Sequence, residues 1–130
     1  MKKLILMFII SACVIAYAGE SRESIIAYDL VNMVADKVIE CESNGRQIIW
    51  GDCDKNIPKP YYCTTLSCAR KYHCKAYGVA QFWKKTFVWL AGLTGRPELK
   101  MESEQDQRWL LTWSIRNGYG KNWTCFRKES

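Results

Sequence analysis

The distribution of cysteines is the feature that most limits what this chain can fold into. The 130-residue sequence has seven cysteines, and Cys13 lies in an apolar N-terminal segment. An even number of cysteines in a small exported domain is typical of a disulfide framework. We therefore expect three disulfides in the rest of the chain, formed by Cys41, Cys53, Cys63, Cys68, Cys74 and Cys125.

The pairing is not fixed by the sequence, because six cysteines allow many connectivities. Four of them crowd between Cys53 and Cys74, which predicts a disulfide-stapled loop. Cys41 and Cys125 remain, and we expect them to pair with each other. A zinc site is the alternative for Cys63, Cys68 and Cys74 with the neighbouring His73. Paired Cys-x2-Cys knuckles are missing, however, and export favours oxidation, so we expect no metal and no cofactor.

An export signal is predicted over residues 1–18. Lys2 and Lys3 precede an apolar stretch, and Ala16-Tyr17-Ala18 has the small-x-small pattern of a cleavage site. The apolar stretch is shorter than the ~20 residues that a membrane-spanning helix needs. The expected mature domain is therefore 19–130, periplasmic or secreted and without a membrane span.

A second interpretation of the same segment is lipid anchoring. Ile10-Ser11-Ala12-Cys13 resembles a bacterial lipoprotein cleavage box, with Cys13 as the lipidated residue. The apolar region before Cys13 would be short for this purpose. Lipidation therefore remains the minor alternative.

Length and charge narrow the class further. A chain of 130 residues suits one domain. Removal of residues 1–18 takes two lysines with it and lowers the formal net charge from +6 to +4. This modest positive charge fits attraction to anionic polymers such as cell-wall glycans and fits simple solubility equally well. No basic run suggests a nucleic-acid partner. We expect a monomer.

The apolar periodicity predicts an α+β domain that is mainly helical. Helical spacing runs over Ser21–Glu42 and Lys84–Leu93, and a third helix begins after Ser103, where Ser103-x-x-Asp106 has a capping-box pattern. One small strand is expected within Arg46–Trp50, and Cys53–Cys74 is expected to be a loop.

Two carboxylates are candidates for chemistry. Glu42 ends an apolar helix face, where lost hydration would raise its pKa and allow it to act as a general acid. Asp52 could be the second acid of a glycosidase pair. A solvated glutamate and an aspartate in a Gly-Asp turn are the plain alternatives. Gln81, Asn117 and Tyr119 add polar groups among apolar neighbours.

Three segments resemble, in order, the motifs of lytic transglycosylases of the lysozyme-like superfamily. They are Cys41-Glu42-Ser43-Asn44-Gly45, Tyr77-Gly78-Val79-Ala80-Gln81-Phe82 and Trp113-Ser114-Ile115-Arg116-Asn117-Gly118. The resemblance implies a lysozyme-like single domain that cleaves the β-1,4 bond between N-acetylmuramic acid and N-acetylglucosamine in peptidoglycan. Glu42 would act as acid and then as base, giving a 1,6-anhydro product. Ser43 would orient Glu42 or the substrate's acetamido group. Gln81 and Asn117 would line the cleft near the reacting sugar, and Tyr119 would also bind substrate.

The chain also departs from this family pattern. Val79-Ala80 stands where Leu-Met is usual, Arg116 replaces a frequent tyrosine, and the cysteine-rich segment 53–74 has no counterpart. These departures keep other functions open. A hydrolytic muramidase using Glu42 with Asp52 is the first alternative. A non-catalytic cell-wall-binding protein and a disulfide-rich inhibitor or toxin are the others.

Overall fold

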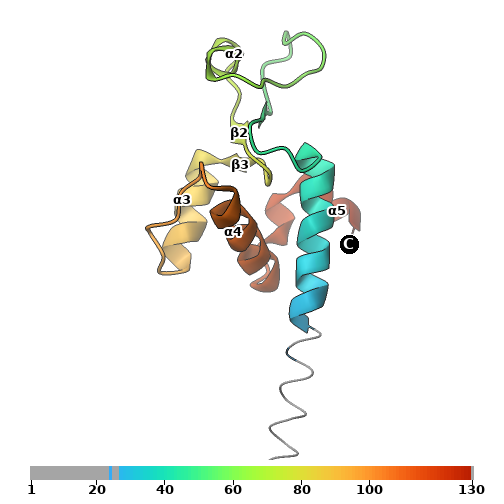
Figure 1. Cartoon of the computed structure of the whole chain (residues 1–130), viewed down its shortest axis with the longest axis vertical. Coiled ribbons are helices and arrows are strands. Elements are labelled where there is room, and N and C mark those ends of the chain that lie inside the picture. Colours follow the sequence, from blue (N-terminus) through green and yellow to red (C-terminus); the bar gives the residue numbers. More distant parts are fainter. Residues whose placement is uncertain (1–23, 25–26, 130) are drawn as a thin grey trace, which may run out of the picture. The chain divides into compact units, whose positions relative to one another are not determined.

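A computed structural model describes residues 24 and 27–129 of the chain (Figure 1). The chain divides into two units, Met1–Met33 and Val34–Ser130. In the first, residues 24 and 27–33 are helical. The predicted signal peptide 1–18 and Cys13 lie outside the described residues. Within the described part, no helix has the length and apolar character needed to cross a membrane.

The second unit is a mainly helical α+β domain, as predicted, and it contains a small three-stranded antiparallel sheet. It begins with helical residues 34–43 and continues with β1 (Trp50–Gly51), α2 (Leu66–Lys71), β2 (Ala76–Tyr77), β3 (Phe82–Trp83), α3 (Lys84–Leu93), α4 (Glu104–Arg116), the 3-10 helix η1 (Gly120–Asn122) and α5 (Thr124–Glu129). The strands follow the order β1-β2-β3. Trp50 pairs with Tyr77, and Ala76 pairs with Trp83.

The small elements differ from the prediction. The expected strand at Arg46–Trp50 is reduced to β1, and a hairpin of β2 and β3 adds two strands. Strands of two residues are too short to show an alternating pattern. The expected loop Cys53–Cys74 contains α2, whose first turn is capped by Thr65, since its Oγ1 accepts a hydrogen bond from the Cys68 amide. One and a half turns give too few residues for a helical period.

The longer helices agree with the prediction. α3 has the predicted bounds, and Ser103 caps α4 by accepting a hydrogen bond from the Asp106 amide at 3.2 Å. The carboxylate of Asp106 does not return to Ser103 as in a full capping box. It accepts a hydrogen bond from the Lys100 amide at 2.9 Å, so it fastens the preceding loop to the helix.

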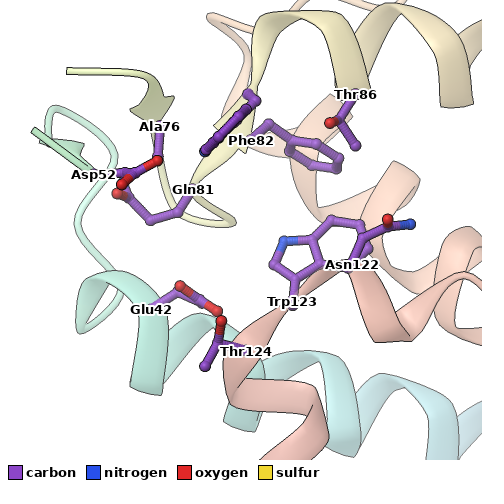
Figure 2. A pocket seen from close by; sticks show the side chains of 10 residues that line it. Glu42, Asp52, Ala76, Gln81, Phe82, Thr86, Asn122, Trp123 and Thr124 are labelled. Carbon is purple, nitrogen blue, oxygen red and sulfur yellow. The ribbon is translucent and has the colours of Figure 1, made fainter. Parts of the chain in front are cut away.

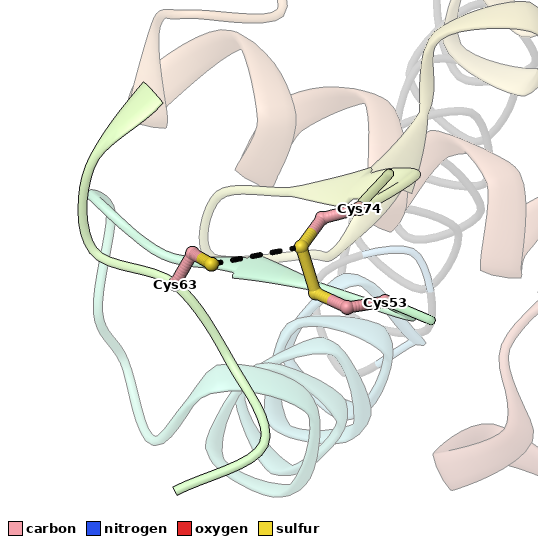
Figure 3. A group of neighbouring side chains, drawn as sticks. All are labelled: Cys53, Cys63 and Cys74. Atoms are coloured by element: carbon pink, nitrogen blue, oxygen red, sulfur yellow. Dashed lines mark hydrogen bonds between the residues drawn. A yellow bond between two sulfur atoms is a disulfide. The ribbon is translucent and has the colours of Figure 1, made fainter. Parts of the chain in front are cut away.

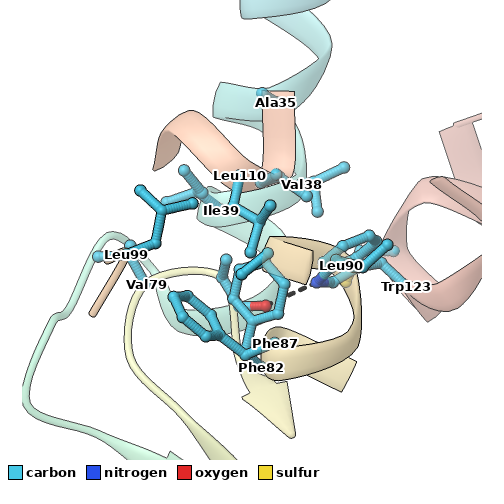
Figure 4. Close-up of a cluster of buried hydrophobic side chains, with 14 residues drawn as sticks. Ala35, Val38, Ile39, Val79, Phe82, Phe87, Leu90, Leu99, Leu110 and Trp123 are labelled. Atoms are coloured by element: carbon cyan, nitrogen blue, oxygen red, sulfur yellow. Dashed lines mark hydrogen bonds between the residues drawn. The ribbon is translucent and has the colours of Figure 1, made fainter. Parts of the chain in front are cut away.

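The core surrounds the hairpin that joins β2 to β3 (Figure 4). Pairing of Tyr77 with Phe82 leaves residues 78–81 as the hairpin loop. Val79 and Ala80 in this loop are fully buried. Phe82 meets Phe87 and Trp123 edge to face, with ring centroids 5.2 and 5.1 Å apart. Most other members of the cluster come from helices: Ala35, Val38, Ile39, Leu90, Ala91, Leu110 and Leu111.

The six cysteines from Cys41 to Cys125 are all paired, and the expected Cys41–Cys125 bond is present. The crowded segment is closed by Cys53–Cys74 and Cys63–Cys68, around a small cluster that includes Ile57 and Ala69. Three disulfides in a small domain indicate an oxidising compartment. They agree with the predicted export, while the choice between periplasm and medium stays a prediction.

The long-range bridge should stabilise the fold more than the local one. Cys41–Cys125 spans 84 residues and Cys63–Cys68 spans five. The chain-entropy model gives about 4.5 kcal/mol for the first and about 2 kcal/mol for the second. Urea unfolding of the two double serine variants should therefore show the larger loss for Cys41→Ser/Cys125→Ser. Equal losses would mean that native packing around the bridges, and not loop closure, sets their contribution.

Candidate functional site

A cleft of about 470 Å³ opens beside the end of the first helix of this unit (Figure 2). Its walls come from four places: the helix end, the sheet with its hairpin, the first turn of α3 and the start of α5. The lining residues are Glu42, Asp52, Ala76, Gln81, Phe82, Trp83, Thr86, Asn122, Trp123 and Thr124. The structure thus brings together three of the predicted residues, Glu42, Asp52 and Gln81.

Glu42 is the half-buried acid of the cleft. Its side chain points from the helix end into the space below Gln81 (Figure 2). Burial raises the pKa of this carboxyl above its usual 4.5, because the charged form loses hydration. A hydrogen bond from the Cys125 amide to Oε1 at 3.2 Å and the charge of Lys128 oppose this effect in part. The site therefore favours a proton on Glu42, as general acid catalysis requires.

The Cys41–Cys125 disulfide fixes the position of Glu42, because it joins the two segments that carry the partners of the Glu42 hydrogen bond. Cys41 precedes Glu42, Cys125 supplies the amide that Glu42 accepts from, and the two cysteines form a disulfide. The bridge therefore joins the helix end to α5 at the acid itself. This explains how an end-of-helix glutamate, which is usually mobile and solvated, keeps one place in the cleft.

Ser43, which we expect to orient Glu42 or the substrate, is buried between the helix that carries Glu42 and the hairpin. Its side chain is 2% exposed, and its hydroxyl donates to the Val79 carbonyl at 2.7 Å, with the Ile39 carbonyl at 3.1 Å. It does not line the cleft. Ser43 joins the helix that carries Glu42 to the hairpin that carries Gln81, so its position suits a positioning residue.

Gln81 and Asp52 form the wall opposite Glu42. Gln81 donates from Nε2 to the carbonyls of Gly78 at 2.9 Å and Ile49 at 3.3 Å, which directs Oε1 towards Gly51. A Cβ at Gly51 would collide with that oxygen, so the glycine makes the close approach possible. Asp52 and Gln81 both have a φ of 49°, in the left-handed region. The backbone therefore turns at both residues, after β1 and before β3.

Asn117 and Tyr119 lie outside the lining of this cleft. Asn117 is exposed at the end of α4, where Nδ2 donates to the Trp113 carbonyl at 2.8 Å. The ring of Tyr119 stacks on Trp113 with centroids 5.8 Å apart. Their packing serves the helix end. The neighbouring Asn122 reaches the cleft in their place.

Two side-chain amides that support the cleft, the buried Gln107 and the partly buried Gln47, were not identified from the sequence. Gln107 is fully buried; it accepts from the Ala80 amide at 3.0 Å and donates to the Met101 carbonyl at 2.6 Å. Gln47 accepts from the Val79 amide at 3.3 Å. Gln107 could have been found, because it lies three and four residues before Leu110 and Leu111 on the apolar face of its helix.

The cysteine-rich segment gives the one possible metal group among the described residues. The sulfur atoms of Cys53, Cys63 and Cys74 lie within 4.8 Å of one another, and Figure 3 draws the 3.8 Å approach of Cys63 to Cys74. All three belong to disulfides, so in this oxidised state they offer no thiolate. The side chain of His73 contacts Asp54, with Nδ1 and Oδ2 2.7 Å apart.

Comparisons with protein families, curated proteins and solved structures give no match to this chain.

The raised pKa of Glu42 should make the free energy of unfolding depend on pH. A carboxyl with a higher pKa in the folded state is stabilising while protonated, and this contribution is lost as the pH rises through that pKa. Relative to Glu42→Gln, the wild type should lose stability as the pH rises above about 4.5, the ordinary pKa of a glutamate. Urea unfolding at a series of pH values measures this difference.

Glu98→Gln is the matched control for that measurement. The hydrogen bond from Arg96 lowers the pKa of Glu98, which is fully exposed. Its pH dependence should have the opposite sign, with the wild-type advantage lost as the pH falls. A difference between wild type and Glu42→Gln that stays constant with pH would contradict the desolvated state of Glu42.

Proposed function

We propose that this protein is a peptidoglycan lytic transglycosylase on a lysozyme-like domain. The observation that carries the proposal is a half-buried carboxyl with a raised pKa, held at a helix end and facing a cleft. The cleft places this acid and the exposed Asp52 beside neutral polar groups on Gln81, Thr86 and Asn122. Neutral donors and acceptors of this kind suit the hydroxyl and acetamido groups of a sugar strand.

The chemistry needs one proton donor that later accepts a proton. Glu42 would protonate the glycosidic oxygen as the bond to C1 of the muramoyl residue breaks, and N-acetylglucosamine would leave as the alcohol. The O6 hydroxyl of the same muramoyl residue would then bond to C1, and its proton would return to the Glu42 carboxylate. No water is consumed, and the enzyme regains its starting state.

Aromatic walls in the cleft support a sugar ligand. Trp83 is 46% exposed at the end of β3, so it offers a ring face for stacking. Trp123 lines the cleft too, but its indole Nε1 donates to the Ala80 carbonyl at 2.7 Å, and the residue is buried. We infer that Trp83 binds substrate and that Trp123 holds the wall in place.

Replacing the acid should abolish cleavage without unfolding the protein. Gln keeps an oxygen for the Cys125 amide and removes only the proton donor, so Glu42→Gln should reduce cleavage of purified peptidoglycan about 100- to 10,000-fold. Released fragments identified by mass measure the rate. Wild-type product with anhydro-muramoyl ends is expected. Unchanged cleavage by Glu42→Gln, or binding without cleavage by the wild type, would contradict the proposal.

A hydrolytic muramidase is the second candidate, because Asp52 lines the same cleft as Glu42. In a hydrolase, Asp52 would activate water or stabilise the cation, and reducing muramic ends would form. In the transglycosylase reaction, Asp52→Asn should retain most of the rate and the anhydro product. A loss as large as that of Glu42→Gln, together with reducing ends from the wild type, would establish the hydrolase instead.

A further inference from the structure

A second pocket of about 370 Å³ lies beside the cleft and shares no lining residue with it. It is formed by the outer part of the sheet, the first residue of α3, and the segments before β2 and α4. Its lining residues are Trp50, Leu66, Cys74, Lys75, Tyr77, Lys84, Met101 and Glu102. The proposed cleavage of the glycan strand uses none of these residues.

The pocket combines an apolar wall with positive charge. The rings of Trp50 and Tyr77, which face each other across the β1–β2 pair, lie 4.8 Å apart at 42°. Lys75 and Lys84 add two exposed cations, against one carboxylate from Glu102. An uncharged sugar has no need of two lysines. A ligand with carboxylates and small apolar groups matches both parts of the pocket.

The two pockets are adjacent. Ala76 and Trp83 line the cleft, and each is next in sequence to a lysine of the second pocket. Lys75 Nζ lies 5.2 Å from the centroid of the Trp83 ring, so this lysine and this tryptophan meet at the border. A sugar stacked on Trp83 would therefore hold its substituents within reach of the lysines.

We propose that the second pocket binds the carboxylate-bearing peptide stem of a muramoyl residue whose sugar ring lies in the cleft. The choice of this occupant rests on the proposed function. Peptidoglycan carries such stems on its muramoyl residues, and each presents carboxylates together with methyl groups. The pocket would make the protein prefer strands with peptides over bare glycan strands.

The first experiment compares cleavage of two substrates: peptidoglycan with its stems, and the same strands after an amidase has removed them. Lys75→Gln/Lys84→Gln should lose roughly 5-fold in kcat/KM on stem-bearing strands, as expected for two exposed ion pairs, and keep the wild-type rate on stripped strands. The loss should shrink at high salt. Because Lys75 touches Trp83, Lys84→Gln alone is also measured, and it should show the same selectivity with a smaller loss.

The matched control is Lys55→Gln/Lys85→Gln, which removes the same charge at two exposed lysines outside both pockets. It should cleave both substrates as the wild type does. An equal loss in the control, or a loss by Lys75→Gln/Lys84→Gln on stripped strands as well, would overturn the proposal, because the lysines would then act through net charge or through the cleft.

The second experiment does not depend on cleavage. A synthetic acidic stem peptide is titrated into wild-type protein, and the indole N–H resonances are followed by NMR. The Trp50 signal should shift, the shift should vanish in Lys75→Gln/Lys84→Gln, and a neutral N-acetylglucosamine oligomer should leave it unchanged. Binding of the peptide without any cleavage would retain this pocket and refute the transglycosylase. Cleavage without peptide binding, or a Trp50 shift with the neutral oligomer, would refute the pocket alone.

Discussion

The burial of the hairpin tip is the constraint on which the domain depends. Val79 and Ala80 have no exposed surface, yet each carries a backbone amide and a carbonyl that lose water when they are buried. An unpaired buried group costs about 1–3 kcal/mol, so all four must find partners. They do so in side chains and not in a strand ladder. The partners are Gln47, Gln107, Ser43 and Trp123.

These partners connect the packing to the cleft. Ser43 follows Glu42, Trp123 precedes Thr124, and Ala80 precedes Gln81. The hydrogen bonds of Ser43, Trp123 and Gln107 to the tip therefore also place cleft residues. Gly78 leaves the space that the amide of Gln107 occupies, since a Cβ there would collide with it. The positions of several cleft residues therefore follow from how the buried turn satisfies its backbone hydrogen bonds.

The long helices, the Cys41–Cys125 bridge and the position of Glu42 after an apolar helix face could be predicted from the sequence, because they depend on periodicity and residue type. The hairpin, α2 and the hydrogen-bond partner of Ser43 could not be predicted. Two-residue strands and a six-residue helix are too short for periodic signals. The partner of Ser43 lies 36 residues away, and nothing local distinguishes a hydroxyl that binds a ligand from one that binds the backbone. The same limit applies to Asn117, because an amide that bonds to the backbone at a helix end looks the same in the sequence as an amide that binds a ligand.

The hydrogen bond between Glu42 and the Cys125 amide joins two residues that are 83 positions apart. The surroundings that raise the pKa of this carboxyl therefore depend on α5, a segment far along the chain from the helix that carries Glu42. Without α5, Glu42 would lie in water as an ordinary ionised carboxylate. A protease that cut between α4 and α5 in reduced protein would therefore return this side chain to ordinary titration, because two remote parts of the chain assemble its environment.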